Sequence, residues 1–205
     1  MNRLESTLKN MILSLGSITL IAGGVLGGVY AITKEPIAKM QHTIQVSAIR
    51  EVAPSFTNDP ESEKWEYTDS TGNKYIIYPA MMNDSIVGAA VESFSMNGFS
   101  GEIRVMCGFD YDGTIRNYKI LSHSETPGLG SKMQQWFSDT IDSRSIIGKN
   151  MNTNSLYVTK DTEHNGEIDA ITAATISSRA FLESVRNAYK AYLEYIKAQN
   201  IGKNE

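Results

Sequence analysis

The chain has 205 residues, of which 41 % are hydrophobic and 20 % are charged, a composition typical of a folded protein rather than a disordered one. Its formal net charge of -4 at pH 7 disfavours a nucleic-acid-binding surface, which requires clustered lysine and arginine. The single cysteine, Cys107, permits no internal disulfide, and the three histidines lack metal-ligand spacing. We therefore expect no nucleic-acid partner and no metal site.

The first predicted element is a transmembrane helix. Residues 11–32 contain no Asp, Glu, Lys, Arg or His. As a helix they rise ~33 Å, which matches the hydrocarbon core of a bilayer. The stretch is too long for a cleaved signal peptide, and the small-residue cleavage pattern is poor. Gly23 and Gly27 form a small-xxx-small pair suited to close helix packing, although glycine as filler fits equally well.

Positive residues flank this span on both sides, so the positive-inside rule does not decide its orientation. They are Arg3 and Lys9 before the span and Lys34, Lys39 and Arg50 after it.

A membrane-proximal helix is predicted next. Apolar residues recur at helical spacing over residues 35–52, Pro36 is acceptable in a first helical turn, and Pro54 ends the run. The predicted organisation is an N-terminal segment with the transmembrane helix over 1–33, the membrane-proximal helix over 34–54, and a folded domain over 55–205.

An antiparallel sheet is predicted for the first half of the folded domain. One face of a predicted strand carries the alternating residues Ile103, Val105, Cys107 and Phe109. Cys107 is therefore expected to pack in the core rather than to act as a reactive thiol. Turn sequences at 69–73 and 112–113 join neighbouring runs as hairpins. The predicted strands are residues 65–67, 75–78, 86–91, 102–109 and 114–121.

The second half of the domain is predicted to end in a long helix. From about Thr172 onward, apolar residues recur at steps of three to five positions. Before it, a helix is predicted over 131–141, a short strand over 156–160 and a turn at 165–166. The predicted fold class is α+β: one N-terminal transmembrane helix, then an antiparallel-sheet domain with a long C-terminal helix.

The segment DAITAATISS, residues 169–178, is rich in hydroxyls but has no neighbouring base. Thr172 is predicted as the N-cap of the last helix, which places Thr175 in the first turn. Backbone N–H groups there lack helical partners, so an anion such as a phosphate is favoured. Ala173 and Ala174 leave the approach open. Taken alone, the segment fits simple helix capping as well.

A second segment, HSETPGLG at residues 123–130, predicts a type II turn over 126–129, with Gly130 as a further permissive position. Such a turn presents backbone N–H groups beside Ser124, Glu125 and Thr126, which suits a polar planar ligand. An ordinary surface loop is the alternative, and His123 reads as a hydrogen-bonded histidine at a strand end.

Together these segments carry a family resemblance. HSETPGLGSKM, the preceding residues 101–121, DAITAATISSRA and the N-terminal span closely resemble the G subunit of the Rnf ion-translocating electron-transport complex, a member of the FMN-binding domain family. They are also similar, less closely in length, to the C subunit of the sodium-pumping NADH:quinone reductase. The resemblance runs from about residue 98 to the C-terminal helix.

The resemblance implies an FMN held covalently, by a phosphoester to the last threonine of a Ser/Thr-Gly-Ala-Thr motif. The match here is residues 172–175, so Thr175 is the expected flavin carrier, with Thr172, Ala173 and Ala174 around it. The family often has glycine where this chain has Ala173. A separate flavin transferase, which takes FMN from FAD, is expected to recognise Asp169, Ser177 and Ser178.

The resemblance also implies a role. The chain is expected to be a single-pass protein of the cytoplasmic membrane that relays electrons to other membrane subunits, with its main domain outside the cytoplasm and lipid around its span. No residue of its own is expected to be catalytic, because FMN does the redox chemistry. The expected neighbours of the flavin ring or ribityl chain are Glu125, Thr126, Leu129 and Gly130.

Three other functions compete with this one. A membrane-tethered interaction module without cofactor would use Thr175 only as a helix cap, and a flavin domain could serve a different extracytoplasmic reductase. A threonine-nucleophile hydrolase fits poorly, because the motif has neither an N-terminal threonine nor a paired base.

Overall fold

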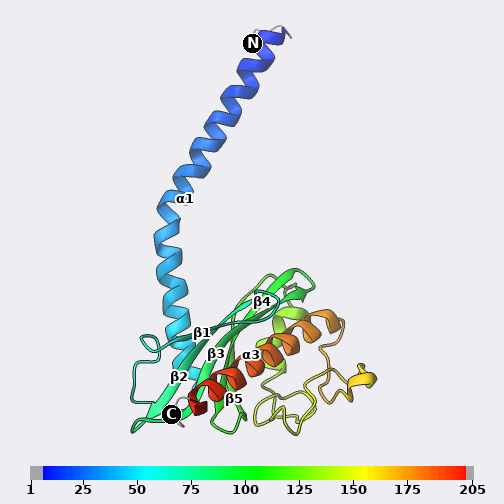
Figure 1. Ribbon diagram of the computed structural model, residues 1–205. Helices are drawn as coiled ribbons and strands as arrows, with labels where there is room; N and C mark the ends of the chain where they lie inside the picture. Colours follow the sequence, from blue (N-terminus) through cyan, green and yellow to red (C-terminus); the bar gives the residue numbers. More distant parts are fainter. Residues whose placement is uncertain (1–6, 202–205) are drawn as a thin grey trace. The chain divides into compact units, whose positions relative to one another are not determined.

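The computed structural model describes residues 7–201. Arg3, which enters the charge count around the span, and the terminal residues 202–205 lie outside this range. The elements, in chain order, are α1 (Leu8–Val52), β1 (Trp65–Thr68), β2 (Lys74–Met82), β3 (Ser85–Gly98), β4 (Gly101–Asp110), β5 (Ile115–His123), the 3-10 helix η1 (Gly130–Lys132), α2 (Met133–Trp136), the 3-10 helix η2 (Thr162–His164) and α3 (Thr175–Ile201) (Figure 1).

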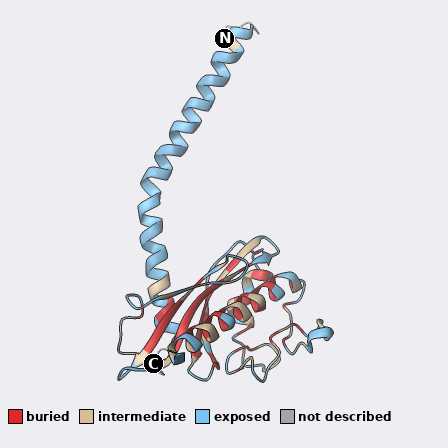
Figure 2. Ribbon diagram, viewed as in Figure 1, coloured by how far each residue is buried: buried red, intermediate tan, exposed pale blue. Residues whose placement is uncertain are grey.

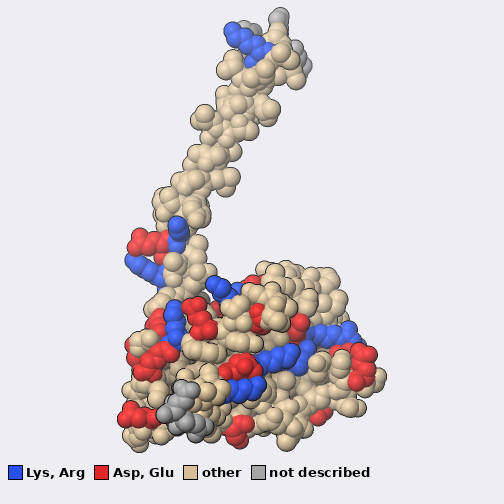
Figure 3. Space-filling model, viewed as in Figure 1, with Lys and Arg blue, Asp and Glu red and all other residues tan. Residues whose placement is uncertain are grey.

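The chain forms two compact units, one up to Thr43 and one from Ile44 onward. In the first unit, α1 contains one stretch long and apolar enough to cross a membrane, and its side chains are exposed. Figure 3 shows this stretch without charged side chains. Residues 35–52 are helical as predicted, but they continue the same helix. Pro36 therefore lies inside α1 rather than in a first turn, where it removes one backbone hydrogen bond.

The second unit is built on a five-stranded antiparallel sheet in the order β1-β2-β3-β4-β5. Both predicted hairpin turns are present. The Asp69 carboxylate accepts hydrogen bonds from the backbone N–H groups of Thr71 and Asn73, and Gly113 takes a φ of +87° between β4 and β5. The prediction of an α+β domain with an antiparallel sheet and a long C-terminal helix is confirmed.

The two faces of the sheet bury different clusters, because successive side chains of a strand point to opposite sides. One face, here called the α3 face, carries Val105, Cys107 and Phe109, all fully buried against α3. Burial raises the pKa of the Cys107 thiol, as expected of a core residue. Figure 2 shows the buried strip along the sheet and along one side of α3.

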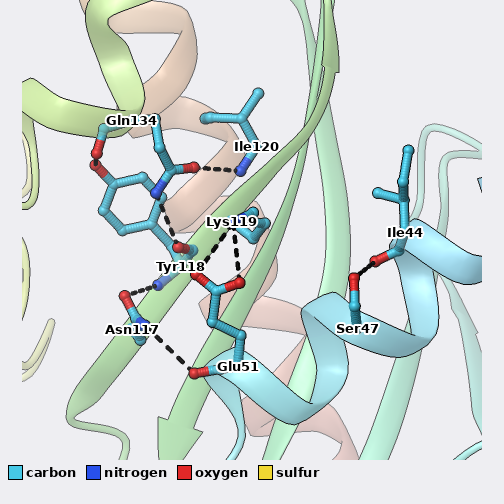
Figure 4. A network of polar contacts seen from close by, with 8 residues as sticks. All are labelled: Ile44, Ser47, Glu51, Asn117, Tyr118, Lys119, Ile120 and Gln134. Atoms are coloured by element: carbon cyan, nitrogen blue, oxygen red, sulfur yellow. Dashed lines mark hydrogen bonds and ion pairs between the residues drawn. The ribbon is translucent and has the colours of Figure 1, made fainter.

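The opposite face, here called the α1 face, is covered by residues 44–52 at the end of α1. Ala48, Ile49 and Val52 pack against Tyr78, Ala90 and Met106 in a smaller cluster. Figure 4 shows polar contacts at its border: Glu51 pairs with Lys119, and its carbonyl accepts a hydrogen bond from Asn117.

Two of the predicted secondary-structure elements are wrong. The helix predicted over 131–141 is reduced to η1 and the four residues of α2, and after it the Arg144 guanidinium carbon lies 4.2 Å from the ring centre of Trp136. The strand predicted over 156–160 is a single parallel bridge between Val158 and Ile168. Tertiary contacts outweigh the local pattern in both segments.

Candidate functional site

The hydroxyl-rich segment forms a tight turn that leads into α3. The helix begins at Thr175, and the Ala174 carbonyl accepts the N–H of Ser178, so Ala174 holds the cap position. The prediction of Thr172 as N-cap is therefore wrong. The reason is Ala173, whose left-handed φ of +61° is incompatible with a helix. Glycine adopts this φ most easily, which accounts for the glycine expected there.

Thr175 lies in the first turn, as predicted, and its side chain is partly exposed. The N–H groups of the first turn have no partner within the helix, and the helix dipole is positive at this end. Lys160 brings a full charge to the same place, with Nζ 3.5 Å from the Thr175 hydroxyl oxygen. An anionic group on this oxygen would therefore meet a favourable field.

Asp169 is held by its backbone rather than by its carboxylate. Its N–H donates to the Ser143 carbonyl at 2.6 Å, and its own carbonyl accepts the indole N–H of Trp136 at 2.8 Å. One carboxylate oxygen lies 3.5 Å from the Thr159 hydroxyl. The half-buried Asp169 thus fixes the start of the turn through its backbone.

The second motif forms the predicted turn after β5. Gly128 has a φ of +78°, and the Leu129 N–H donates to the Thr126 carbonyl at 3.2 Å, as a type II turn requires. His123 ends β5, and its Nδ1 accepts the N–H of Glu125. The sequence predicts Gly130 as a further permissive position, but its φ is not in the left-handed region. Glycine is needed there for space, because a Cβ would lie 2.5 Å from the Ser177 hydroxyl oxygen.

The structure divides the predicted site residues by exposure. Exposed or partly exposed are Ser124, Thr126, Leu129, Asp169, Thr172, Ala173 and Thr175, whereas Glu125, Gly130, Ala174, Ser177 and Ser178 are buried.

The two motifs meet through a buried contact. The Ser177 hydroxyl donates to the Glu125 carboxylate at 2.5 Å, which joins the loop after β5 to the first turn of α3. The Ser178 hydroxyl donates to the Ala174 carbonyl and accepts the Ile171 N–H, so it closes the turn. Recognition of these two serines by a transferase stays a prediction, and their burial favours a structural role.

A cavity of about 420 Å³ lies beside α3, and its lining includes Ile176 and Arg179, which neighbour Thr175 on the helix. Also in its lining, the Arg186 guanidinium carbon lies 3.8 Å from the ring centre of Tyr157, whose ring stacks on His164. Burial lowers the pKa of Arg186, whereas hydrogen bonds to Asp161 raise the pKa of Arg179. Figure 3 shows basic and acidic side chains side by side on the surface of the domain.

Sequence reasoning missed the residues of this cavity and missed Lys160. Lys160 is fifteen positions before Thr175 and reaches it only through the fold, so no local pattern signals the contact. The spacing of Ile176, Arg179, Glu183 and Arg186 does place them on one helix side, which was the available signal. Within residues 7–201, no three His, Cys, Asp or Glu side chains are grouped to bind a metal ion.

Comparison with known proteins gives consistent results. A family model described as FMN-binding domain matches residues 98–190. The G subunit of the ion-translocating oxidoreductase complex of Aliivibrio fischeri (strain MJ11) is 32 % identical over 201 residues, covering 92 % of this chain and 93 % of its own. The G subunits of the same complex from Vibrio atlanticus (strain LGP32) and Yersinia pestis are each 30 % identical, covering 95 % and 94 % of this chain and 93 % of their own.

Proposed function

Because the chain belongs to the family of G subunits of ion-translocating oxidoreductase complexes, we propose that it is a membrane-anchored carrier of FMN bonded to Thr175. Family membership makes it an FMN-binding, electron-carrying subunit of a translocase with further subunits. The covalent attachment, its position and the membrane anchor are the parts that we propose. When bound, FMN supplies the redox chemistry, and the chain sets its position and surroundings.

The contact between Lys160 and Thr175 is the observation that carries the proposal. A phosphodiester on the threonine oxygen would place one negative charge beside the Lys160 ammonium group and the open N–H groups of α3. The hydroxyl is partly exposed, so a second protein can reach it. Among residues 7–201, the side-chain contact of this hydroxyl is with the Lys160 ammonium group, which is not a base, and this suits a reaction whose catalytic groups belong to a transferase.

The attachment is a phosphoryl transfer from FAD. The Thr175 oxygen attacks the phosphorus on the flavin side of the FAD diphosphate, the bond from that phosphorus to the AMP oxygen breaks, and AMP leaves. The hydroxyl proton passes to the transferase. The chain contributes an accessible hydroxyl and a positive field for the developing charge.

The exposed residues of the loop after β5 are the proposed neighbours of the ring. Thr126 and Leu129 offer a polar and an apolar surface, with Leu129 40 % exposed. Ser124 is exposed next to them in the loop. Gly130 leaves space for the Glu125 and Ser177 side chains that hold this loop against α3. The cavity along α3, whose lining begins at Ile176, is the proposed further space for the body of the ligand.

The proposed anchor is the apolar part of α1 in the cytoplasmic membrane, with the main domain outside the cytoplasm. Cys107 is fully buried, so a second cysteine at exposed Ser62 gives one reactive thiol. In Ser62→Cys, an impermeant maleimide added to intact spheroplasts should label the chain. Labelling only after membrane permeabilisation would place the domain inside the cell instead.

The attachment is tested by intact mass and peptide mapping of the chain co-expressed with a flavin transferase. The wild type should gain the mass of FMN less one water, on the peptide covering residues 169–179. Thr175→Ala should stay folded, lose the added mass and lose flavin fluorescence in a denaturing gel. Thr175→Ser, which keeps a hydroxyl, should retain measurable flavin.

Matched substitution of another exposed threonine, Thr162→Ala, should leave flavin loading unchanged. A flavin signal that survives Thr175→Ala would contradict the assignment. A bare chain mass for the wild type, despite an active transferase, would instead support an interaction module without cofactor.

A further inference from the structure

Glu125 is a buried carboxylate that joins three segments of the chain. Its side chain is 4 % exposed. One carboxylate oxygen accepts the hydroxyl of Ser177 at 2.5 Å, from the first turn of α3, and the other accepts the N–H of Ser100 at 3.0 Å, from the turn between β3 and β4. Both oxygens are thus occupied by donors from elsewhere in the fold, and Figure 1 shows these segments at the same end of the domain.

Two glycines make room for this carboxylate. A Cβ on Gly98 would lie 2.3 Å from the Gly101 carbonyl oxygen and 2.7 Å from one Glu125 oxygen, and a Cβ on Gly130 would lie 2.7 Å from the other Glu125 oxygen. The Gly130 Cβ would also meet the Ser177 hydroxyl oxygen at 2.5 Å. A methyl group added at Gly130 would therefore push the carboxylate and the Ser177 hydroxyl apart. The fit of the three segments depends on small residues on both sides of the charge.

Because Glu125 is buried, its carboxylate depends on its hydrogen-bond partners. A buried carboxylate is strongly disfavoured unless it accepts hydrogen bonds, and hydrogen bonds to a charged acceptor are stronger than neutral ones. Glu125 has two such bonds, so its carboxylate favours the one arrangement that brings both donors to it. Displacing any of the three segments would leave a charge or a donor without its partner.

Ser177 stands two residues after Thr175 in the same helical turn, so the contact fixes how α3 begins. We propose that Glu125 is a positioning residue, which holds the first turn of α3 against the loop after β5 so that Thr175 and Thr126 face one ligand. This inference rests on the proposed function, since that ligand is the flavin of Thr175. It assigns to Glu125 an action through Ser177 in place of direct contact with the ring.

The test measures the initial rate at which a purified flavin transferase, supplied with FAD, loads the full-length chain. Glu125→Ala should lower this rate by roughly tenfold to a hundredfold, because small displacements of a reacting group have effects of this size. Glu125→Gln should stay within about threefold of wild type, because its amide can accept from Ser100 and donate to Ser177. Gly130→Ala should resemble Glu125→Ala, since its methyl group displaces the same contact.

A second measurement separates positioning from loss of structure. Fluorescence anisotropy of the attached flavin should fall in the slowly loaded variants once they are fully loaded, because the ring loses a fixed wall. Circular dichroism selects folded variants, and Ser177→Ala carries the test if Glu125→Ala does not fold. Glu66→Gln, an exposed carboxylate on β1, is the matched control and should load like wild type.

The outcomes are distinct. Loading of folded Glu125→Ala or Ser177→Ala at the wild-type rate, with wild-type anisotropy, would overturn this inference alone. Equal losses in Glu125→Gln and Glu125→Ala would also overturn it, because the two hydrogen bonds, which the Gln amide can still make, would then not be what loading depends on. A wild-type chain that takes no flavin on Thr175 would overturn the proposed function and this inference with it.

Discussion

The two faces of the sheet are held by different forces. On the α3 face, large apolar and aromatic side chains form an extensive core: Phe181 stacks on Phe137 with ring centres 4.5 Å apart. On the α1 face, the apolar cluster is small and a polar network lies beside it. There, Gln45 donates to both Tyr78 and the nearly buried Glu92, which also accepts from Arg104.

This contrast predicts that the stability contributed by the α1 face can change without affecting the flavin site on α3. Apolar burial supplies most of the free energy of folding, whereas hydrogen bonds and ion pairs add little net stability but fix one geometry. The candidate flavin site begins on α3, whose inner side belongs to the larger core. The end of α1, which connects to the apolar span, rests on the smaller cluster. We therefore expect changes on the α1 face to leave the flavin site intact.

The largest expected effect comes from the α3 face. Phe181→Ala removes a fully buried ring that contacts Phe137 and Tyr118, and should lower the free energy of unfolding by about 3 to 5 kcal/mol. Urea denaturation followed by circular dichroism measures this loss. Phe99→Ala is the matched control: its ring is 67 % exposed, so a change within about 0.5 kcal/mol is expected. Equal losses in both variants would contradict the described core.

A smaller effect is expected from the α1 face. A Cβ on Gly108 would lie 1.9 Å from the Val52 carbonyl oxygen, so Gly108→Ala forces the end of α1 off the sheet. The free energy of unfolding should fall by about 1 to 3 kcal/mol, as for overpacked sites. Flavin loading of Thr175 should stay at the wild-type level, because α3 and its contacts are unchanged. Joint loss of stability and loading would show that the two faces are not independent.

The same contrast explains how much of the fold the sequence predicted. Strands with one strongly apolar side were recognised, since Val105 and Phe109 alternate with residues of the other face. Residues 131–160 were misread because their structure depends on distant partners. The Ile146 N–H donates to the Phe137 carbonyl, and Tyr157 lies under Arg186 from α3. The spacing of apolar residues within one segment carries no information about contacts with other segments.

For the candidate site, the sequence predicted where the motifs lie but not how their side chains are used. Thr175 was placed correctly at a helix start, because hydroxyl-rich residues precede an amphipathic run. The family resemblance implies Glu125 as a neighbour of the flavin, which stays a prediction, but no local pattern predicts that the fold buries it against Ser177. The one sequence signal for this burial is Gly130, because a larger residue there would collide with Glu125 and Ser177.

The smallest expected effect is that of the ion pair between Lys119 and Glu51 at the border of the α1 face. The Lys119 Nζ and Glu51 Oε2 atoms lie 2.9 Å apart, but the two side chains are 37 % and 44 % exposed, so water weakens their attraction. Lys119→Met should therefore lower the free energy of unfolding by only about 0.2 to 1 kcal/mol. The loss should shrink when urea denaturation is repeated at high salt, because salt screens exposed charges. Lys74→Met, an exposed lysine at the start of β2, is the control for a change of charge alone. A loss that is larger and insensitive to salt would mean that Lys119 acts through buried packing, and the α1 face would then resemble the α3 face more closely than its contacts indicate.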